Sequence, residues 1–432
     1  MIQKKLIDQI EGEATVYFEL KDEKVEHASI AFPHFRGMEK ILEGKNALDA
    51  LVITPRVCGI CGHAHLMACV RAIENAYENA GMQVKLTKKA KDLREITLIL
   101  EIIQNHFKWL YLVIIPALNK LSKSEEEDFP LKGAFAASLA TKILAIFAGQ
   151  WPHSSYMHPG GVTSDPSHVE RLQALSYMDE LINFFEKECL GVDIEAFLGF
   201  ESCNDMEFMQ SDIGTLGKTL MQMNMHNQGH AHDRFIVFGE HSFTKVSKVL
   251  QTRLVNVDEK YISTKDAYCP DEKTYAKNAL YKGEFYESGP LARAMSMNVP
   301  LIKNMHRRFK DSAYTRVMSR VIELAQLLQD CKGLIQNLSL DESSFTSLND
   351  ITQLNAKGIG IVEAPRGSLV HKIDIEKGII VSYEIITPTQ WNLGSSKKDK
   401  LSPSQMSMKG TPVSDSLFIF RTFDVCSVCT TH

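Results

Sequence analysis

The sequence predicts an α+β fold dominated by helices, with a central bundle of long helices and small peripheral β-sheets. Long stretches carry apolar residues at helical spacing, and short segments rich in β-branched and aromatic residues occur towards both ends. Each terminal region also contains a Cys-x-x-Cys pair, Cys58 with Cys61 and Cys426 with Cys429. One four-sulfur site can include both pairs only if the N- and C-terminal segments meet, so we expect them to meet at a buried metal site.

Two strands and four helices are expected in the first half of the chain. Residues 14–20 are rich in β-branched and aromatic side chains and predict a strand, which a polar turn separates from a second strand over 25–31. Pro116 should kink the second of the helices near its end, and Ser164 or Asp165 should cap the last one. Apolar residues at helical spacing predict these helices over residues 64–79, 86–122, 131–148 and 165–189.

The second half predicts one further helix and a small sheet. Residues 191–286 mix short strands with turns, and residues 299–338 have the apolar spacing of another long helix. Three segments rich in β-branched residues predict an antiparallel meander over 358–362, 371–375 and 378–386. Since no repeat, low-complexity tract or linker divides the sequence, we expect a single domain over residues 1–432.

Composition and charge restrict the class of protein. The 432 residues are 44% hydrophobic, and the net charge of −5 gives no basic field for nucleic acid, so no nucleic-acid partner is expected. Nine cysteines, an odd number, favour reduced thiols and metal binding over a disulfide framework. The N-terminal residues become charged before an apolar stretch develops, and the apolar run 109–118 is too short to span a bilayer. We expect a cytoplasmic protein without a direct membrane span, with membrane association only through partner subunits.

The two cysteine pairs alone leave the metal open. Four thiolates select zinc, iron or nickel, and geometry decides among them. Zinc ribbons also combine two such pairs, but about 15–20 residues usually separate the pairs and the metal organises a small fold. Here nearly the whole chain separates them. A structural four-thiolate zinc site is the alternative at this point, although a chain with a core of this size gains little from it.

Further motifs give the sequence a resemblance to a known family. The segments 56–65 and 423–432, which contain the two cysteine pairs, resemble the two signature motifs of the nickel–iron hydrogenase large (catalytic) subunit. Five more segments resemble motifs of that family and occur in the expected order, so the resemblance extends over the full chain. They are residues 10–12, 35–39, 287–293, 363–367 and 383–392.

The resemblance implies the ligands of a nickel–iron centre. It implies that Cys58 and Cys426 are terminal thiolates on nickel, that Cys61 and Cys429 bridge nickel to iron, and that iron carries carbon monoxide and cyanide. The implied activity is reversible heterolytic cleavage of dihydrogen into protons and electrons. Cys426 would be the first proton acceptor, and Glu11 would pass the proton outward.

The resemblance also implies roles for residues around the centre. Arg366 and Thr389 would donate hydrogen bonds to the two cyanides, in a pocket that includes Pro365. Without catalysis, Arg366 would instead form a buried ion pair with Asp424. His65, one helical turn after Cys61, would donate to a bridging sulfur.

A second metal site is implied at some distance from the first. Glu39, His432 and a backbone carbonyl near Ile385 match a magnesium-type site that water molecules complete. Carboxylate, carbonyl and water ligands suit Mg²⁺, but an imidazole ligand is less usual for it, so another divalent ion is an alternative.

Electron transfer requires a partner. The remaining five cysteines show no iron–sulfur spacing. The resemblance therefore implies an iron–sulfur small subunit, which alone carries the clusters, in a heterodimer or a dimer of heterodimers. Maturation factors are further implied partners, because family members are typically made with a C-terminal extension that is removed after nickel is loaded.

Two alternatives share the resemblance. A regulatory hydrogen sensor would have the same metals but slow turnover and a hydrogen-dependent change in partner binding. A quinone-reducing relative that has lost the metals would not need the ligands, and the presence of both cysteine pairs and His432 argues against it.

Overall fold

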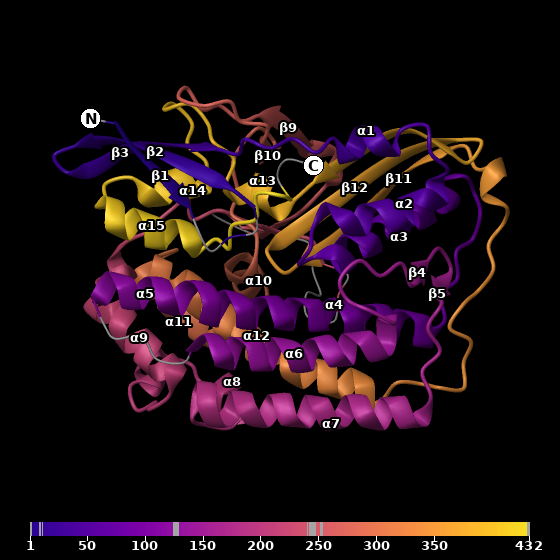
Figure 1. Cartoon of the computed structure of the whole chain (residues 1–432), viewed down its shortest axis with the longest axis horizontal. Helices are drawn as coiled ribbons and strands as arrows, with labels where there is room; N and C mark the ends of the chain where they lie inside the picture. The colour runs from indigo at the N-terminus through magenta and orange to yellow at the C-terminus, as the bar shows by residue number, and fades with distance from the viewer. Residues whose placement is uncertain are drawn as a thin grey trace.

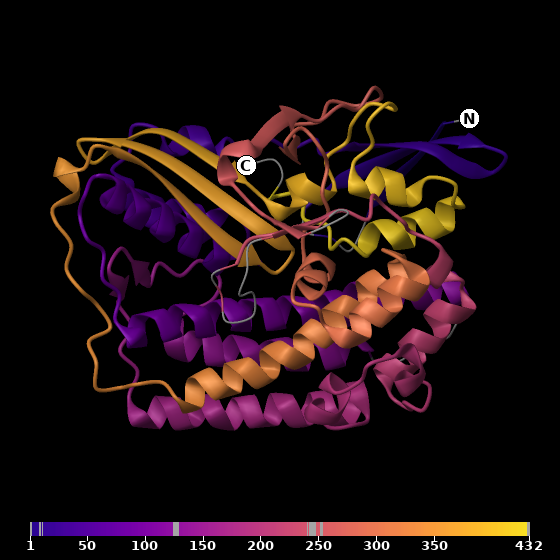
Figure 2. The same cartoon turned by 180° about the vertical axis from the view of Figure 1, so that it is seen from behind.

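The computed structural model describes residues 2–7, 10, 12–123, 129–239, 241, 248–250 and 254–429, with the backbone alone at 129–130, 248–250 and 254–256. Long helices form one half of the molecule (Figure 1). They lie side by side along its long axis and contact one another, and Figure 2 shows the last of them along its whole length from the opposite side. These helices are α4 (Lys88–Lys108), α6 (Phe129–Ala148), α7 (His168–Phe184) and α12 (Ala313–Gln336).

The other half contains the largest sheet and the helix packed on it. Strands β11 (Ala356–Ala364), β12 (Gly367–Glu376) and β13 (Ile379–Ile386) form an antiparallel meander, which confirms the predicted one. Helix α3 (Gly62–Asn79) lies against β11 and β12 (Figure 1). Since α3 begins directly after Cys61, the packing of this helix on the sheet determines where the first cysteine pair lies.

Two glycines allow α3 to approach the sheet closely. A Cβ atom at Gly358 would overlap the carbonyl oxygen of Ala72, and one at Gly360 would overlap that of Ala68. Any larger residue at these two positions of β11 would therefore push the strand away from the helix.

The remaining strands form small sheets. The first three, β1 (Ile2–Ile7), β2 (Ala14–Lys21) and β3 (Lys24–Ala31), pair in chain order and antiparallel. The rest form a two-stranded sheet of β4 and β5, a three-stranded sheet of β6, β7 and β8, and a two-stranded sheet of β9 and β10. Their bounds are β4 Met157–His158, β5 Gly161–Val162, β6 Phe235–Val237, β7 Lys248–Leu250, β8 Leu254–Asn256, β9 Ile262–Asp266 and β10 Lys277–Tyr281.

In the part of the chain that the structure describes, ten shorter helices lie between these elements, and the last three of them lead to the second cysteine pair. They are α1 Met38–Leu42, α2 Ala50–Ile53, α5 Ile115–Ser122, α8 Ile194–Leu198, α9 Asp212–Gln222, α10 Pro290–Ser296, α11 Pro300–Phe309, α13 Pro388–Asn392, α14 Pro403–Met408 and α15 Val413–Arg421.

The predicted long helices are found, with differences at their ends and breaks. The helix expected over 86–122 contains a π-helical segment, Trp109–Ile114, and Pro116 lies in the first turn of α5 directly after it. The predicted cap of α7 was wrong. Ser167 is the N-cap and forms a capping box with Glu170, because the Ser-x-x-Glu pattern satisfies two backbone N–H groups that Ser164 or Asp165 would leave unpaired.

The single helix predicted over 299–338 was also wrong, since α11 and α12 are separate. Lys310 adopts a φ of 51°, and the Ser312 hydroxyl accepts from the backbone N–H of Thr315 and so starts a new helix. The prediction missed β1, whose short sequence alternates in burial along the edge of the first sheet. The expectation of a single domain over residues 1–432 stays a prediction.

Two helical stretches, residues 88–122 and 131–148, are long and apolar enough to cross a membrane by length and composition alone. Core helices of water-soluble proteins have the same property. In the first stretch 83% of the most apolar window is buried inside the protein, and in the second 50% is.

Candidate metal centre

The four cysteine side chains of the two pairs meet at one place in the interior. The Sγ atoms of Cys58 and Cys426 are 3.9 Å apart, those of Cys61 and Cys429 are 3.5 Å apart, and those of Cys426 and Cys429 are 2.8 Å apart. All four residues are at most 5% exposed, and none forms a disulfide. The structure thus brings the two ends of the sequence together at a buried four-sulfur cluster, as the motifs predict.

The first pair is held by a turn and a helix start. The Sγ atom of Cys58 accepts the backbone N–H groups of Ile60 and Cys61 at 3.3 and 3.2 Å, so the turn closes around that sulfur. The buried carboxylate of Glu101, on α4, accepts the N–H groups of His63 and Ala64 at 2.8 and 2.9 Å. The N–H groups in the first turn of a helix have no partner within the helix. Glu101 supplies one for these two and so ties the start of α3, beside Cys61, to the helical layer.

The second pair is held by Asp424. This residue follows α15, adopts a φ of 59° and is 6% exposed. Its carboxylate accepts from Arg320 Nη1 at 2.6 Å and from Asn105 Nδ2 at 2.8 Å. Burial opposes its ionisation, but the guanidinium groups of Arg366 and Arg320 hold the pKa of Asp424 below its usual value. A charged anchor two residues before Cys426 thus fixes the backbone at the start of the second cysteine pair against α4 and α12.

Arg366 lies between this anchor and the sulfurs. Its Nε donates to the carbonyl oxygen of Asp424 at 3.1 Å and lies 3.1 Å from a carboxylate oxygen of the same residue. Its Nη1 lies 3.9 Å from Cys61 Sγ. The ion pair with Asp424, considered as an alternative, is present, and it orients the same guanidinium towards the cluster.

The cluster cannot become fully charged without a cation. Burial opposes ionisation of Cys58, but hydrogen bonds from the neighbouring thiols and the charge of Arg366 lower its pKa well below the ordinary value. Burial raises the pKa of Cys426 well above the ordinary value, and the charge on Cys58 raises it further. One thiolate therefore disfavours the next in this dry site, and a bound divalent metal would supply the positive charge that four thiolates need.

The donor set fits a nickel–iron centre. Four sulfur donors suit soft transition metals. The hydroxyl of Thr389 is buried and has no hydrogen-bond partner in the described part of the chain, and the same holds for Gln390 Nε2. Thr389 thus has a free donor, as expected of a residue that binds a small ligand such as cyanide. Pro365, which was predicted to line the same pocket, accepts a hydrogen bond from Arg293 Nη2 at its carbonyl oxygen, at 3.3 Å.

Two of the residues predicted for the second metal site, Glu39 and Ile385, are in contact. The carboxylate of Glu39 accepts the backbone N–H of Ile385 at 2.8 Å, so these two residues do lie together. This contact involves the amide N–H of Ile385 rather than its carbonyl oxygen. A residue that the prediction missed, Lys277, places its ammonium group 3.3 Å from the other Glu39 oxygen. His432 lies outside the described residues.

His65 belongs to a buried network of polar side chains. Its Nδ1 lies 3.0 Å from Nε2 of His371, and Nδ1 of His371 lies 2.7 Å from the Tyr383 hydroxyl. Since His371 engages Nδ1 of His65, the predicted bond to a sulfur would require Nε2. Local sequence does not predict this polar network, since β12 and β13 bring His371 and Tyr383 to α3 only in the folded protein.

Other residues of the site were either missed or cannot be placed. Glu11 lies outside the described residues, so its predicted relay role has no structural test here. The role of Glu101 was missed, although a glutamate inside the apolar run of a core helix indicates a buried carboxylate with a specific partner. Burial raises the pKa of Glu101 to about 8, even though two backbone N–H groups favour its charged form.

Comparison with known protein families shows which proteins this chain resembles. The family described as nickel-dependent hydrogenase matches residues 36–116 and 135–432. Sulfhydrogenase 2 subunit alpha of Pyrococcus furiosus is 26% identical, and the alignment covers 98% of this chain and 97% of that protein. The hydrogenase-2 large chain of Escherichia coli is 24% identical, with 99% of this chain and 96% of that protein covered.

Solved structures show the same fold. The Ni-Fe-Se hydrogenase from Desulfovibrio vulgaris Hildenborough in the reduced state superposes with a TM-score of 0.84 at 18% identity, over 100% of both chains. A reduced, active form of the Ni-Fe-Se hydrogenase from Desulfomicrobium baculatum superposes with a TM-score of 0.84 at 21% identity, again over 100% of both chains. The predicted helix-dominated α+β fold, with the termini meeting at a cysteine cluster, is confirmed.

Proposed function

This chain belongs to the nickel-dependent hydrogenase family and is a large, catalytic subunit that acts on dihydrogen, and we propose that Cys58, Cys61, Cys426 and Cys429 hold its nickel–iron centre. The observation that carries this proposal is the convergence of the four buried sulfurs beside Arg366, from opposite ends of the sequence. When bound, the centre would supply the heterolytic cleavage of dihydrogen into protons and electrons.

The residues around the sulfurs support distinct roles. Cys426 Sγ is the proposed first acceptor of the proton, and Glu11 is the proposed next one. Arg366, kept in place by Asp424, offers a fixed cationic group beside Cys61, which suits a cyanide ligand on iron. The unpartnered Thr389 hydroxyl suits a second cyanide. Carbon monoxide is the remaining proposed ligand of iron.

We further propose a divalent ion, Mg²⁺ by preference, near Glu39, Ile385 and His432. The contact between Glu39 and Ile385 supports it. The ammonium of Lys277 already offsets part of the Glu39 charge. Magnesium counted in the purified protein, and its loss in Glu39→Gln, would support the site. Full magnesium content in that variant would exclude Glu39 as a ligand.

A large subunit of this kind pairs with a small subunit, and we propose that the small subunit carries iron–sulfur clusters. The four cysteines of the centre leave five others, at 69, 189, 203, 269 and 331. The only group of three or more potential metal ligands in the described part of the chain lies at the four-sulfur cluster. We also propose a cytoplasmic location, consistent with nine free thiols, which cell fractionation would test.

Dihydrogen-dependent reduction of an artificial electron acceptor tests the proposed function. The purified complex of large and small subunits should reduce a viologen dye under dihydrogen and not under argon. No reduction by a complex that contains nickel and iron would contradict catalysis. The sensor alternative is not favoured, because the relatives reported above are named as hydrogenases.

A further inference from the structure

The segment 287–293 resembles a family motif for which the sequence indicated no role, and it packs on the turn that carries Arg366. Gly289, at the start of α10, has a φ of 120°, and Gly367, at the start of β12, has a φ of 130°. A Cβ atom on Gly289 would lie 2.8 Å from the carbonyl oxygen of Arg366, and one on Gly367 would lie 2.8 Å from Gly289 N. Two glycines are thus needed for the two backbones to approach this closely.

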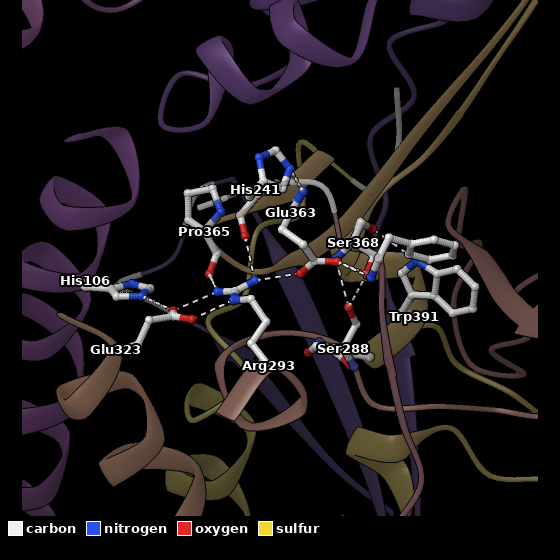
Figure 3. A network of polar contacts seen from close by, with 12 residues as sticks. His106, His241, Ser288, Arg293, Glu323, Glu363, Pro365, Ser368 and Trp391 are labelled. Atoms are coloured by element: carbon white, nitrogen blue, oxygen red, sulfur yellow. Dashed lines mark hydrogen bonds and ion pairs between the residues drawn. The ribbon is translucent and has the colours of Figure 1, made fainter. Parts of the chain in front are cut away.

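Arg293, one turn into α10, uses its guanidinium group to bind both that turn and Glu323 on α12 (Figure 3). Its Nη1 donates to Glu363 Oε2 at 2.9 Å and to the carbonyl oxygen of Ala364 at 3.1 Å. Its Nη2 donates to the carbonyl oxygen of Pro365 at 3.3 Å and to Glu323 at 2.7 Å, and its Nε donates to Glu323 at 2.6 Å. These five bonds use all five N–H donors of an arginine, and three of them go to consecutive residues directly before Arg366.

The groups that bind Arg293 are themselves fixed. Figure 3 shows Glu323 between Arg293 and His106, whose Nε2 lies 2.8 Å from the carboxylate. Glu363 is 0% exposed and also accepts the backbone N–H of Phe238 at 3.0 Å. The whole arrangement therefore ties the turn to α4 through His106, to α10 through Arg293 and to α12 through Glu323.

A serine in the same segment closes the other side of the turn. Ser288 Oγ accepts the backbone N–H of Ser368 at 2.8 Å and lies 3.1 Å from the hydroxyl of Ser368. The segment thus contacts the turn both before and after Arg366. Figure 3 shows these serines on the side of Glu363 away from Glu323.

We propose that Arg293 is a positioning residue for Arg366, so that the segment 287–293 sets the geometry of the cationic group beside the metal centre. Arg293 has no contact with the four sulfurs among the described residues; it acts through the backbone of residues 364 and 365. A guanidinium beside a metal ligand is effective only within a narrow range of positions, and a clamped turn supplies that precision. This inference rests on the proposed function, because it uses the cyanide ligands to report on Arg366.

A conservative substitution separates positioning from charge. Arg293→Lys keeps the positive charge between Glu323 and Glu363 but has three donors on one atom, so it cannot reach both carboxylates and both carbonyl oxygens. Arg94→Lys is the matched control. Arg94 is equally buried, binds Glu74 with both Nη atoms and donates to the carbonyl oxygens of His158 and Gly161, away from the Arg366 turn.

The experiment records the infrared spectrum, nickel and iron content and melting temperature of the wild type, Arg293→Lys, Arg94→Lys and Arg366→Lys. Both Arg293→Lys and Arg94→Lys should melt earlier. Only Arg293→Lys should shift the cyanide bands, in the direction that Arg366→Lys shifts them, and combining it with Arg366→Lys should add little further shift.

Unmoved cyanide bands in Arg293→Lys, or an equal shift in Arg94→Lys, would overturn the inference and leave the proposed function intact. Absence of the bands from the wild type would overturn the proposed function and this inference with it. If Arg293→Lys does not fold, Ser288→Ala tests the contribution of the same segment, because it removes the hydrogen bonds that Ser288 Oγ forms with the backbone N–H and the hydroxyl of Ser368. It should shift the same bands by less, and unchanged bands would overturn the inference.

Discussion

Cys426 is the residue whose replacement tests the centre most sharply. Serine has nearly the same size as cysteine and fits the buried position, but its oxygen is a poor ligand for nickel. We expect Cys426→Ser to retain the fold, to lose nickel and to lose turnover by at least ~100-fold, because losing a metal ligand should cost more than losing an outer-shell contact. Metal analysis, circular dichroism and dye reduction measure the three quantities.

Cys331→Ser provides the control for this substitution. Cys331 lies on α12, is 0% exposed and belongs to no cysteine group. Its variant should keep nickel and turnover while losing some stability. Equal loss of nickel in both variants would indicate a general effect of polar substitution in the core and contradict the ligand assignment.

His106 gives the protein a pH-dependent stability. Burial is the main cause that lowers its pKa from 6.5 to about 4, although Glu323 favours the charged form. Between these values the unfolded chain binds a proton that the folded chain does not, so stability should fall as the pH falls from about 6.5 to about 4. At 1.36 kcal/mol per pKa unit, this residue accounts for about 3 kcal/mol at most.

Urea unfolding of the wild type and of His106→Gln at several pH values measures this contribution. Glutamine still donates a hydrogen bond but does not titrate, so the wild type should lose its advantage over the variant as the pH decreases. A stability difference that stays constant from pH 7 to pH 4.5 would contradict the assignment.

At the residue scale, motif spacing in the sequence was enough to predict which of several residues lie together. Both cysteine pairs and Arg366 meet in the structure, and Glu39 meets Ile385. The sequence indicated Asp424 only as the partner of Arg366 in a non-catalytic ion pair, yet its carboxylate also anchors the second cysteine pair. The partners of a buried ion depend on which helices meet. The contacts of Glu101 and Arg293 therefore could not be inferred from local sequence.

At the scale of elements, the packing of β11 on α3 controls the position of the first cysteine pair. Gly360→Ala would place a Cβ atom against the carbonyl oxygen of Ala68 and force the strand away from the helix. We expect a loss of about 1–3 kcal/mol of unfolding free energy or more, together with reduced nickel content, because both Cys61 and Arg366 adjoin these elements. Chemical denaturation and metal analysis provide the measurements.

Gly333→Ala is the matched glycine substitution. Gly333 lies in α12, and no atom beyond its own helix and chain neighbours lies within 4 Å of the position of an added Cβ atom. This variant should gain about 0.5–1 kcal/mol, since alanine favours a helix over glycine. A similar loss in both variants would show that close approach to α3 is not the cause.

The elements that the sequence predicted correctly have clear helical periodicity, a long apolar run or strong β-propensity, as in α3, α6 and the meander β11 to β13 respectively. Errors arose where a local hydrogen bond overrides periodicity. Ser312 starts α12 inside a continuous helical pattern, and Ser167 caps α7 three residues after Ser164. The π-helical segment Trp109–Ile114 lies directly before the turn that contains Pro116, and apolar spacing alone does not distinguish it from an α-helix.

At the scale of the whole molecule, the metal centre joins segments from opposite ends of the chain. Binding to the folded state alone stabilises that state, so the metal-loaded protein should melt at a higher temperature than protein produced without nickel. The segment 424–429 should also exchange its amide hydrogens more slowly when the centre is loaded. Hydrogen–deuterium exchange detected by mass spectrometry measures this.

Helix α7, at the outer edge of the helical layer in Figure 1, supplies the internal control for exchange. Its protection should change little with metal loading. Equal protection of 424–429 in both forms would mean that the protein alone fixes the end of the chain and that the metal does not contribute.

The infrared spectrum of the purified protein, with nickel and iron counted on the same sample, tests whether these four sulfurs hold a nickel–iron centre with carbon monoxide and cyanide on iron. We predict sharp carbon monoxide and cyanide stretches that shift under dihydrogen, with equal amounts of nickel and iron. Zinc in place of both metals, with no such stretches, would show a structural site and contradict the account.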